Sequence, residues 1–200
     1  QNDYHQVLTE LPRVAGGTRA ADAVRIPLQD MLAKRVRFVQ SEISGFDVAG
    51  RRLLTGAGPI GWRWLVLALG SRPNDFAIPG LAQRTLSLYS AGDAERVWAA
   101  AGTALTAAGA ATDPDRHRRL ATVGVGGGGA TGVELAGAIA ELARHGLEQE
   151  FRNFDPASAR VLLVQAGPRI LPAFPEVLSV RARQALEALG VEVRLDSRVE

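Results

Sequence analysis

The stretch "TVGVGGGGATGVELAG", Thr122 to Gly137, decides the fold of this chain. A short segment with alternate valines precedes four consecutive glycines, and a run rich in Ala, Leu and Glu follows them. A strand, a glycine turn and a helix in this order form the βα unit that binds the pyrophosphate of a dinucleotide. The register that fits the chain is Gly127, Gly129 and Gly132.

Each glycine of this register has its own expected role. Gly127 makes the tight turn, Gly129 lets the backbone approach a pyrophosphate, and Gly132 lets the helix pack close to the strand. The N–H groups of Ala130, Thr131 and Gly132 then face the ligand, whose negative charge the helix macrodipole favours.

The remaining glycines have no place in this pattern. Gly128 is expected to be free to vary. Gly124 and Gly126 point to the same face of the predicted strand, where a glycine costs roughly 0.5–1 kcal/mol relative to alanine. Either a helix backbone comes unusually close to that face, or the sheet is less stable than its relatives.

The sequence from residue 120 onward predicts a parallel α/β sheet of βαβαβ order. Apolar residues recur at intervals of three and four along the first helix, as one buried face requires: Val133, Ala136, Ala140, Ala143 and Leu147. The predicted elements are a strand at Leu120–Gly126, a helix from Ala130 to about Phe151, a strand at Arg160–Gln165, a helix at Glu176–Leu189 closed by Gly190, and a strand at Val191–Leu195.

Strands of a different kind are expected in the first third of the chain. Between Lys34 and Thr55, apolar and polar residues alternate, with turn residues at Ser44/Gly45 and Ala49/Gly50. This period predicts antiparallel strands with one wet face. The continuous apolar run Trp64–Leu69 predicts a buried, parallel strand.

The middle of the chain carries a crossing segment and a helix start. The stretch Arg72–Gly80 gathers two prolines, an Asn and a Gly, and is interpreted as an interdomain crossing. Ser90 and Asp93 have the spacing of a capping box, which predicts a helix to about Ala108. The basic run Arg116–Arg119 is interpreted as a solvated entry to the next strand rather than as a phosphate-backbone contact.

Composition bounds the function. The 200 residues are 46% hydrophobic and 22% charged, which is typical of a globular protein. The net charge is only +2, and its basic residues are scattered, so no nucleic-acid partner is expected. The absence of cysteine excludes disulfides, thiolate metal sites and a CxxC redox pair within this chain, and no metal site is expected. The chain opens at Gln1 without a methionine and is interpreted as the interior of a longer protein.

Two polar residues near the glycine loop bear on nucleotide choice. In a dinucleotide site the second strand ends in an acid that receives the adenosine ribose hydroxyls, and here it ends in Gln165. Glutamine carries no charge to repel the 2′-phosphate of NADPH, so NADH with tolerated NADPH is predicted. The nearby Arg169 has two readings, a partner for that phosphate or, with the greater weight, a surface residue.

Three segments together resemble the type II NADH dehydrogenases, single-subunit flavoenzymes that pass electrons from NADH to a quinone: "VGGGGATGVELAGAIAEL", "VLLVQAGPRILPAFPE" and "LVLALGSRPNDFAIPG". The resemblance covers nearly the whole chain. It implies an α/β, FAD/NAD(P)-binding two-dinucleotide fold, with a Rossmann-like βαβ NAD domain and part of an FAD domain that carries an antiparallel β insert. Residues 1–76 would be the partial FAD domain and residues 77–200 the incomplete NAD(P)H domain.

The resemblance also implies the cofactors, FAD and NAD(H) with NADP(H) as an alternative, and a hydride transfer from nicotinamide C4 to flavin N5. It implies a part for each of the following residues: Gly127 in the turn, Gly129, Ala130, Thr131 and Gly132 at the pyrophosphate, Gln165 at the adenosine ribose, Glu134 as the catalytic residue in the nicotinamide region, Ala68, Leu69 and Gly70 against the FAD, and Leu8, Thr9 and Glu10 near its ring. Glu134 has a simpler alternative, a favourable charge on the helix dipole.

The implied partner is a quinone, the implied location is cytoplasmic or peripheral on the inner face of the cell membrane, and a homodimer is left open. The missing cysteines favour a quinone reductase over disulfide reductases and sulfide-oxidising relatives. Two other hypotheses remain: a related flavoprotein reductase with a protein acceptor, such as ferredoxin or rubredoxin, and a non-catalytic NAD(H)-binding module.

Overall fold

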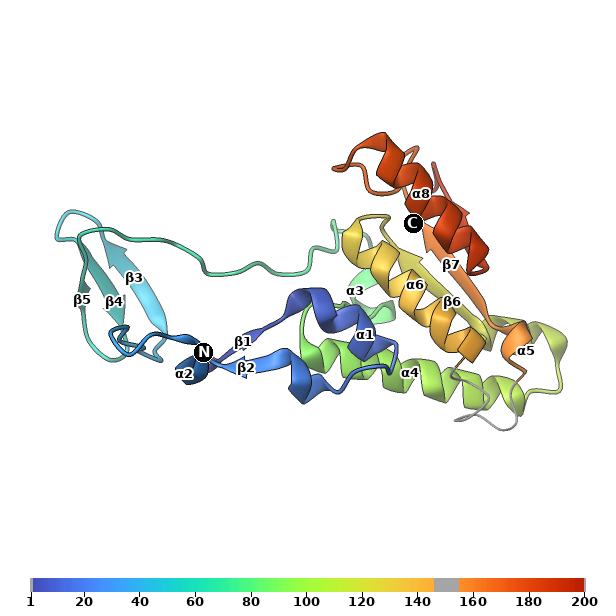
Figure 1. The fold of residues 1–200 in the computed structure, drawn as a ribbon, viewed down its shortest axis with the longest axis horizontal. Coiled ribbons are helices and arrows are strands. Elements are labelled where there is room, and N and C mark those ends of the chain that lie inside the picture. Colours follow the sequence, from blue (N-terminus) through green and yellow to red (C-terminus); the bar gives the residue numbers. More distant parts are fainter. Residues whose placement is uncertain (1, 146–154, 200) are drawn as a thin grey trace. The chain divides into compact units, whose positions relative to one another are not determined.

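The computed structural model describes residues 2–145 and 155–199 (Figure 1). The elements, in chain order, are β1 Tyr4–Gln6, η1 Leu8–Glu10, α1 Leu11–Ala15, η2 Ala21–Val24, β2 Arg25–Pro27, α2 Leu28–Met31, β3 Ile43–Asp47, β4 Arg52–Thr55, β5 Ile60–Gly61, α3 Leu81–Arg84, α4 Ala91–Gly109, α5 Pro114–Leu120, β6 Thr122–Gly126, α6 Ala130–His145, η3 Pro156–Ser158, β7 Arg160–Val164, α8 Glu176–Ala188 and β8 Val191–Arg194. None of the described helices is long and apolar enough to cross a membrane.

The chain divides into two compact units. Unit 1 holds the residues up to Val7 together with Arg25–Pro73, and unit 2 holds Leu8–Val24 together with the chain from Asn74 onward. The passage at Pro73 lies inside the stretch that the sequence marks as a crossing. Compactness says nothing about which nucleotide either unit binds, so the division into an FAD part and an NAD(P)H part stays a prediction.

The parallel sheet predicted for unit 2 is confirmed. Strands β6, β7 and β8 lie side by side in that order, and both pairs are parallel. Helices α6 and α8 cover the same face of this sheet (Figure 1). The apolar side chains of that face form one core with both helices. That core contains Val125, Leu163 and Val191 from the strands, Ala136, Ile139 and Ala140 from α6, and Leu186 from α8. The predicted continuation of α6 to Phe151, with Leu147 on its buried face, falls outside the described residues.

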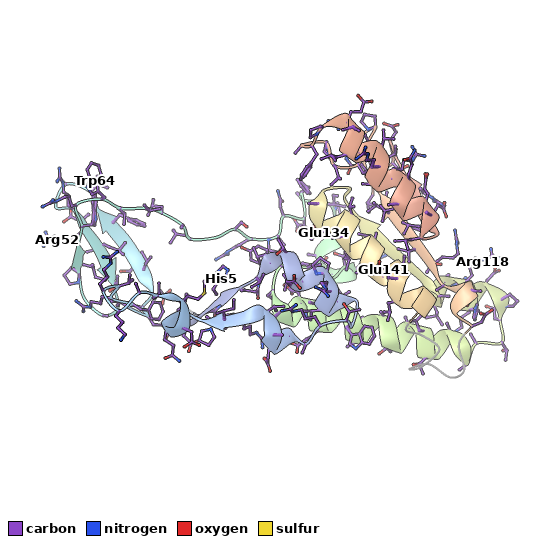
Figure 2. The ribbon with its side chains drawn as sticks, viewed as in Figure 1. His5, Arg52, Trp64, Arg118, Glu134 and Glu141 are labelled. Carbon is purple, nitrogen blue, oxygen red and sulfur yellow. The ribbon has the colours of Figure 1, made fainter. Side chains whose placement is uncertain are left out.

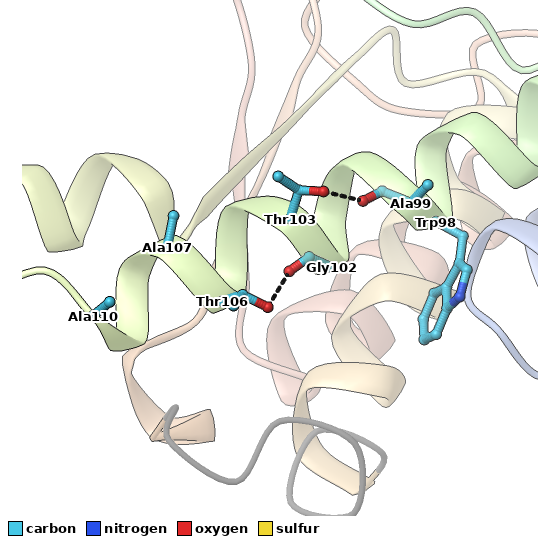
Figure 3. Close-up of a pocket in the computed structure, with 7 residues that line it drawn as sticks. All are labelled: Trp98, Ala99, Gly102, Thr103, Thr106, Ala107 and Ala110. Carbon is cyan, nitrogen blue, oxygen red and sulfur yellow. Dashed lines mark hydrogen bonds between the residues drawn. The ribbon is translucent and has the colours of Figure 1, made fainter.

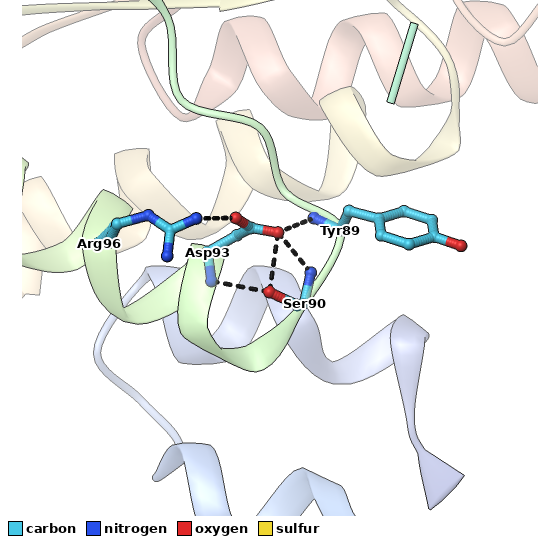
Figure 4. Close-up of polar contacts among 4 residues, drawn as sticks. All are labelled: Tyr89, Ser90, Asp93 and Arg96. Atoms are coloured by element: carbon cyan, nitrogen blue, oxygen red, sulfur yellow. Dashed lines mark hydrogen bonds and ion pairs between the residues drawn. The ribbon is translucent and has the colours of Figure 1, made fainter. Parts of the chain in front are cut away.

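The ends of the helices follow the local signals. Helix α8 ends at Ala188, and Gly190 takes the left-handed conformation, with φ +79°, that commonly follows a helix end. The capping box of α4 is present (Figure 4): Ser90 Oγ accepts from the N–H of Asp93 at 3.1 Å, and Asp93 Oδ2 accepts from the N–H of Ser90 at 2.7 Å. The Asp93 carboxylate, which is 7% exposed, also pairs with Arg96 and accepts from the N–H of Tyr89.

The short helices α1, α2, α3 and α5 were not predicted, and α5 contradicts one of the interpretations. Pro114–Leu120 forms α5, so the basic run Arg116–Arg119 lies on a helix and not at the entry to a strand. Asp113 caps it, since its carboxylate accepts from the N–H of Arg116 at 3.0 Å, and Pro114 occupies the first helical position. Asp followed by Pro is a start signal that the sequence contained. The basic residues of the last turn suit the negative end of the helix dipole.

The prediction of antiparallel strands between Lys34 and Thr55 is confirmed only in part. Strands β3, β4 and β5 form an antiparallel sheet, and the turn at Ala49/Gly50 joins the first two. The turn expected at Ser44/Gly45 is wrong, because Gly45 lies inside β3 where the register shifts. Val36 and Phe38 lie in no strand. The alternation of apolar and polar residues therefore covers a longer stretch than the strands that form.

The prediction of a buried parallel strand at Trp64–Leu69 is wrong. The segment has no strand conformation, and Trp64 and Val66 are 88% and 85% exposed. A strand needs a hydrogen-bonding neighbour, and the described residues supply none for this run. The apolar side chains of this segment are therefore left largely uncovered by the described residues.

Replacing Ser90 by Ala tests the capping box. The substitution removes the acceptor for the Asp93 N–H, so unit 2 should lose about 1 kcal/mol of stability. Urea unfolding followed by far-UV circular dichroism measures the change. Thr103→Ala in the exposed middle of α4 is the matched control and should stay within about 0.5 kcal/mol of the parent. Equal stability of the parent and the Ser90 variant would contradict the role of the cap.

Candidate functional site

The turn between β6 and α6 begins at Gly127. Its φ is +98°, a conformation that side chains rarely adopt, and its N–H donates to the carbonyl of Val164 at 2.8 Å. Gly127 therefore makes the tight turn that the sequence predicts. The hydrogen bond joins that turn to the carboxyl end of β7.

Gly132 provides the close approach of helix to turn. A Cβ atom built on Gly132 would collide with the carbonyl oxygen of Gly127. Neither atom can move away easily, because one lies in the first turn of α6 and the other in the tight turn. Glycine at this position is a packing requirement, which agrees with the predicted role.

Gly129 differs from its neighbours because it has free space in front of it. No described atom lies within 4 Å of a Cβ built there, and its carbonyl accepts the first hydrogen bond of α6, from the N–H of Val133 at 3.0 Å. The next two residues, Ala130 and Thr131, are exposed. The start of a 16-residue helix, with exposed backbone and an open approach, can accommodate an anion such as a pyrophosphate.

The expectation that Gly128 is free to vary is wrong. Gly128 is buried, and a Cβ atom on it would lie 2.9 Å from Cγ2 of Ile170 and 3.2 Å from the Cβ of Gln165. Its carbonyl accepts from the N–H of Leu171 at 2.6 Å. Gly128, the third glycine of the run Gly126–Gly129, is needed because the connection between β7 and α8 packs against it. The available signal was a glycine at a position of the run that the pattern leaves variable.

Gln165 lies at the carboxyl end of β7 beside the glycine loop, where the second strand of a dinucleotide site carries its ribose-binding residue. Its side-chain oxygen Oε1 accepts from the N–H of Gly128 at 2.8 Å. The amide nitrogen Nε2 is then the group that remains for a ribose hydroxyl or a phosphate. The contact with the nucleotide itself stays a prediction.

The other predicted site residues are distributed over both units. Glu134 is exposed in the first turns of α6 (Figure 2), which suits either of its two expected roles. Thr9 is exposed in η1 of unit 2, and Glu10 beside it already pairs with Arg13 and Arg19. The segment Ala68–Gly70 is exposed in unit 1. The structure thus gathers the pyrophosphate and ribose candidates and leaves the FAD candidates in separate units.

One of the two explanations for Gly124 and Gly126 has no support among the described residues. No described atom lies within 4 Å of a Cβ built on either glycine, so no described helix backbone comes close. Their strand neighbours in the register are Leu162 and Val164, on the face of the sheet opposite the α6 and α8 core. The second explanation, a less stable sheet, stays a prediction.

Two carboxyl groups among the described residues have lowered pKa values, and neither belongs to the glycine loop. The pKa of Glu192 is lowered by hydrogen bonds from Arg194 and from Arg160 on the neighbouring strand. The pKa of Asp47 is lowered by the backbone N–H of Gly50 and by Arg52. Both groups are ion-pair partners on strands, and these hydrogen bonds and ion pairs account for the lowered pKa values.

A surface pocket runs along α4 (Figure 3), and it is not part of this site. Small residues line most of it, with Trp98 at one end. The hydroxyl groups of Thr103 and Thr106 donate to the carbonyls of Ala99 and Gly102 in their own helix. The lining residues therefore present little polar chemistry to a ligand.

The close contact at Gly132 predicts a large effect of one methyl group. Gly132→Ala should lower the stability of unit 2 by about 3 kcal/mol, because its Cβ overlaps the backbone of the tight turn. The matched control is Gly137→Ala in the same helix, whose Cβ would meet only Leu186 at an ordinary 3.7 Å. That control should gain up to about 1 kcal/mol from helix propensity. Thermal unfolding monitored by circular dichroism compares the two, and similar midpoints would contradict the packing argument.

Comparison with known proteins agrees with this geometry. The family model described as pyridine nucleotide-disulphide oxidoreductase matches residues 9–200. The type II NADH:quinone oxidoreductase Ndh of Mycobacterium tuberculosis is 33% identical over 98% of the chain, and the type II NADH:quinone oxidoreductase of Staphylococcus aureus is 27% identical over 98% of it. The chain spans 44% and 48% of the lengths of these two relatives.

A solved structure shows the same fold. NDH2 from Plasmodium falciparum, determined in complex with NADH, superimposes with a TM-score of 0.81 over 97% of this chain and 41% of that protein, at 18% identity. The resemblance to type II NADH dehydrogenases and the two-dinucleotide α/β fold expected from the sequence are both confirmed. On the match of its residues 9–200, the chain belongs to the pyridine nucleotide-disulphide oxidoreductase family.

Proposed function

We propose that this chain provides the NAD(P)H-binding part, and some of the FAD-binding part, of a dehydrogenase that passes hydride from NADH to FAD and then electrons to a quinone. The observation that carries the proposal is the glycine loop. Gly127 is required by its left-handed backbone, and Gly128 and Gly132 by packing, whereas Gly129 has neither constraint and leaves open space before the N-terminus of α6. That space is where a dinucleotide pyrophosphate would lie.

In this proposal the residues of the chain bind and orient, and the cofactors supply the redox chemistry, a hydride passing from nicotinamide to flavin. Backbone N–H groups from Gly129 to Gly132 hold the pyrophosphate, and Nε2 of Gln165 donates to the adenosine ribose. Glu134 lies on the same helix, exposed toward solvent, and is assigned to the nicotinamide region.

The part proposed for FAD rests on family resemblance. Ala68–Gly70 and Thr9 are exposed, and the apolar run Trp64–Leu69 is uncovered. Both relatives are more than twice as long as this chain, which supports an FAD domain completed by further residues. Peripheral association with the inner face of the membrane, and a homodimer, belong to the same proposal.

Calorimetric titration with NADH tests the loop. The parent chain should bind NADH, and Gly129→Val should abolish binding, because its side chain fills the space that the pyrophosphate needs. Gly124→Val is the matched control: it also points into open space, but on the far face of the sheet, and should bind like the parent. Equal binding by the Gly129 variant would place the nucleotide elsewhere.

Gln165→Glu tests the choice between NADH and NADPH. The carboxylate can still accept from the N–H of Gly128, so the loop should keep its geometry. Its negative charge should weaken NADPH binding at least about fivefold relative to NADH, through repulsion of the 2′-phosphate. The ratio of the two dissociation constants is the measurement, and an unchanged ratio would remove Gln165 from the ribose site.

The electron acceptor is tested by turnover. The names of the relatives support a quinone. The protein loaded with FAD should oxidise NADH with a soluble quinone analogue as acceptor. Reduction of ferredoxin or rubredoxin in place of the quinone would indicate the reductase with a protein acceptor, and binding of NADH without any flavin would indicate the non-catalytic module.

A further inference from the structure

One arginine side chain in the connection between β7 and α8 hydrogen-bonds to backbone carbonyls of the same connection. The guanidinium of Arg169 donates to the carbonyl of Pro172 at 2.7 Å and to the carbonyl of Phe174 at 3.0 Å. The hydroxyl of Ser179, which is 5% exposed, donates to the carbonyl of Ile170 at 2.7 Å and ties the same connection to α8. The segment from Arg169 to Phe174, which we name the brace turn, is thus held at both ends.

The brace turn reaches the glycine loop at Gly128. The N–H of Leu171 donates to the carbonyl of Gly128, and the side chain of Ile170, 1% exposed, packs against its Cα. Gln165, just before the brace turn, accepts from the N–H of Gly128. Both backbone polar groups of Gly128 are therefore fixed by residues of this connection, and the next residue along is Gly129.

We propose that Arg169 is a positioning residue for nucleotide binding. By closing the brace turn it holds Ile170 and Leu171 against Gly128, and so sets the direction of the N–H groups that follow at the start of α6. Two N–H groups of the guanidinium are directed at carbonyls of its own turn, which favours a role within the turn over a contact with a 2′-phosphate. The inference rests on the proposed binding of NAD(P)H at the loop.

The two roles of Arg169 predict different nucleotide dependences. The pyrophosphate is common to NADH and NADPH, so loss of a positioning residue weakens both by the same factor. A ligand of the 2′-phosphate would affect NADPH alone. The ratio of the two affinities therefore distinguishes the roles without any measurement of turnover.

The experiment titrates NADH and NADPH into the protein and its Arg169→Gln variant by calorimetry. Loss of two hydrogen bonds that hold the turn should weaken both nucleotides about three- to tenfold, with their affinity ratio unchanged. Arg169→Lys should restore part of the loss, because an ammonium group can still donate to one of the carbonyls. The matched control is Arg183→Gln, which removes an exposed pair with Glu187 on α8 and should bind both nucleotides like the parent.

A purely structural role would lower the unfolding midpoint without changing affinity in the folded protein, so binding is measured well below that midpoint. In turnover, the KM for NADH should rise while kcat stays constant. Should Arg169→Gln fail to fold, Ser179→Ala loosens the same turn from the α8 side and should show the same nucleotide-independent loss.

Three results would overturn the inference. A loss confined to NADPH would make Arg169 a phosphate ligand. Unchanged affinity in Arg169→Gln, or in Ser179→Ala where the first variant does not fold, would show that the brace turn has no effect on the loop. Failure of the parent itself to bind either nucleotide would overturn the proposed function as well, so the two failures are distinguishable.

Discussion

The contact between the carbonyl of Gly127 and the Cα of Gly132 is the constraint on which unit 2 depends. It joins the end of β6 to the first turn of α6 at a distance that no side chain allows. From that point α6 runs back over the sheet, and its small residues Ala136 and Ala140 let it lie close to Val125 and Leu163. A larger residue at Gly132 would displace the helix and, with it, the core that the helix covers.

Three glycines of the loop are explained by the fold, and the role proposed for the remaining one is to leave room for a ligand. Gly127 has a left-handed backbone, Gly128 is buried against Ile170, and Gly132 touches backbone, so each is explained by the chain itself. Gly129 has no such explanation among the described residues. A glycine that packing does not require, placed at the start of a long helix, is the strongest physical argument in this chain for a bound anion.

The apolar segment at Trp64–Leu69 shows why strand formation is not a local property. Its composition suits a buried strand, yet the described chain provides no neighbour for its backbone, and the segment forms no strand and is largely exposed. Strands β3 and β4, only a few residues earlier, form because the turn at Ala49/Gly50 brings their edges together. A helix makes its backbone hydrogen bonds within itself, so α4 and α6 form without a neighbouring strand.

The sequence by itself determined the glycine register, the capping box at Ser90, the helix α4, and the order and approximate bounds of β6, α6, β7, α8 and β8. Each of these depends on residues within a few positions of one another, through backbone conformation, a cap or a repeat of apolar side chains. The tertiary structure alone decided that Gly128 must be glycine, that Gln165 turns its oxygen toward the loop, and that Arg169 closes the brace turn. Those outcomes depend on atoms brought together from distant positions, as in the bond between Gly128 and Gln165, which are 37 residues apart. No local pattern encodes which backbone group a side chain will meet across such a separation.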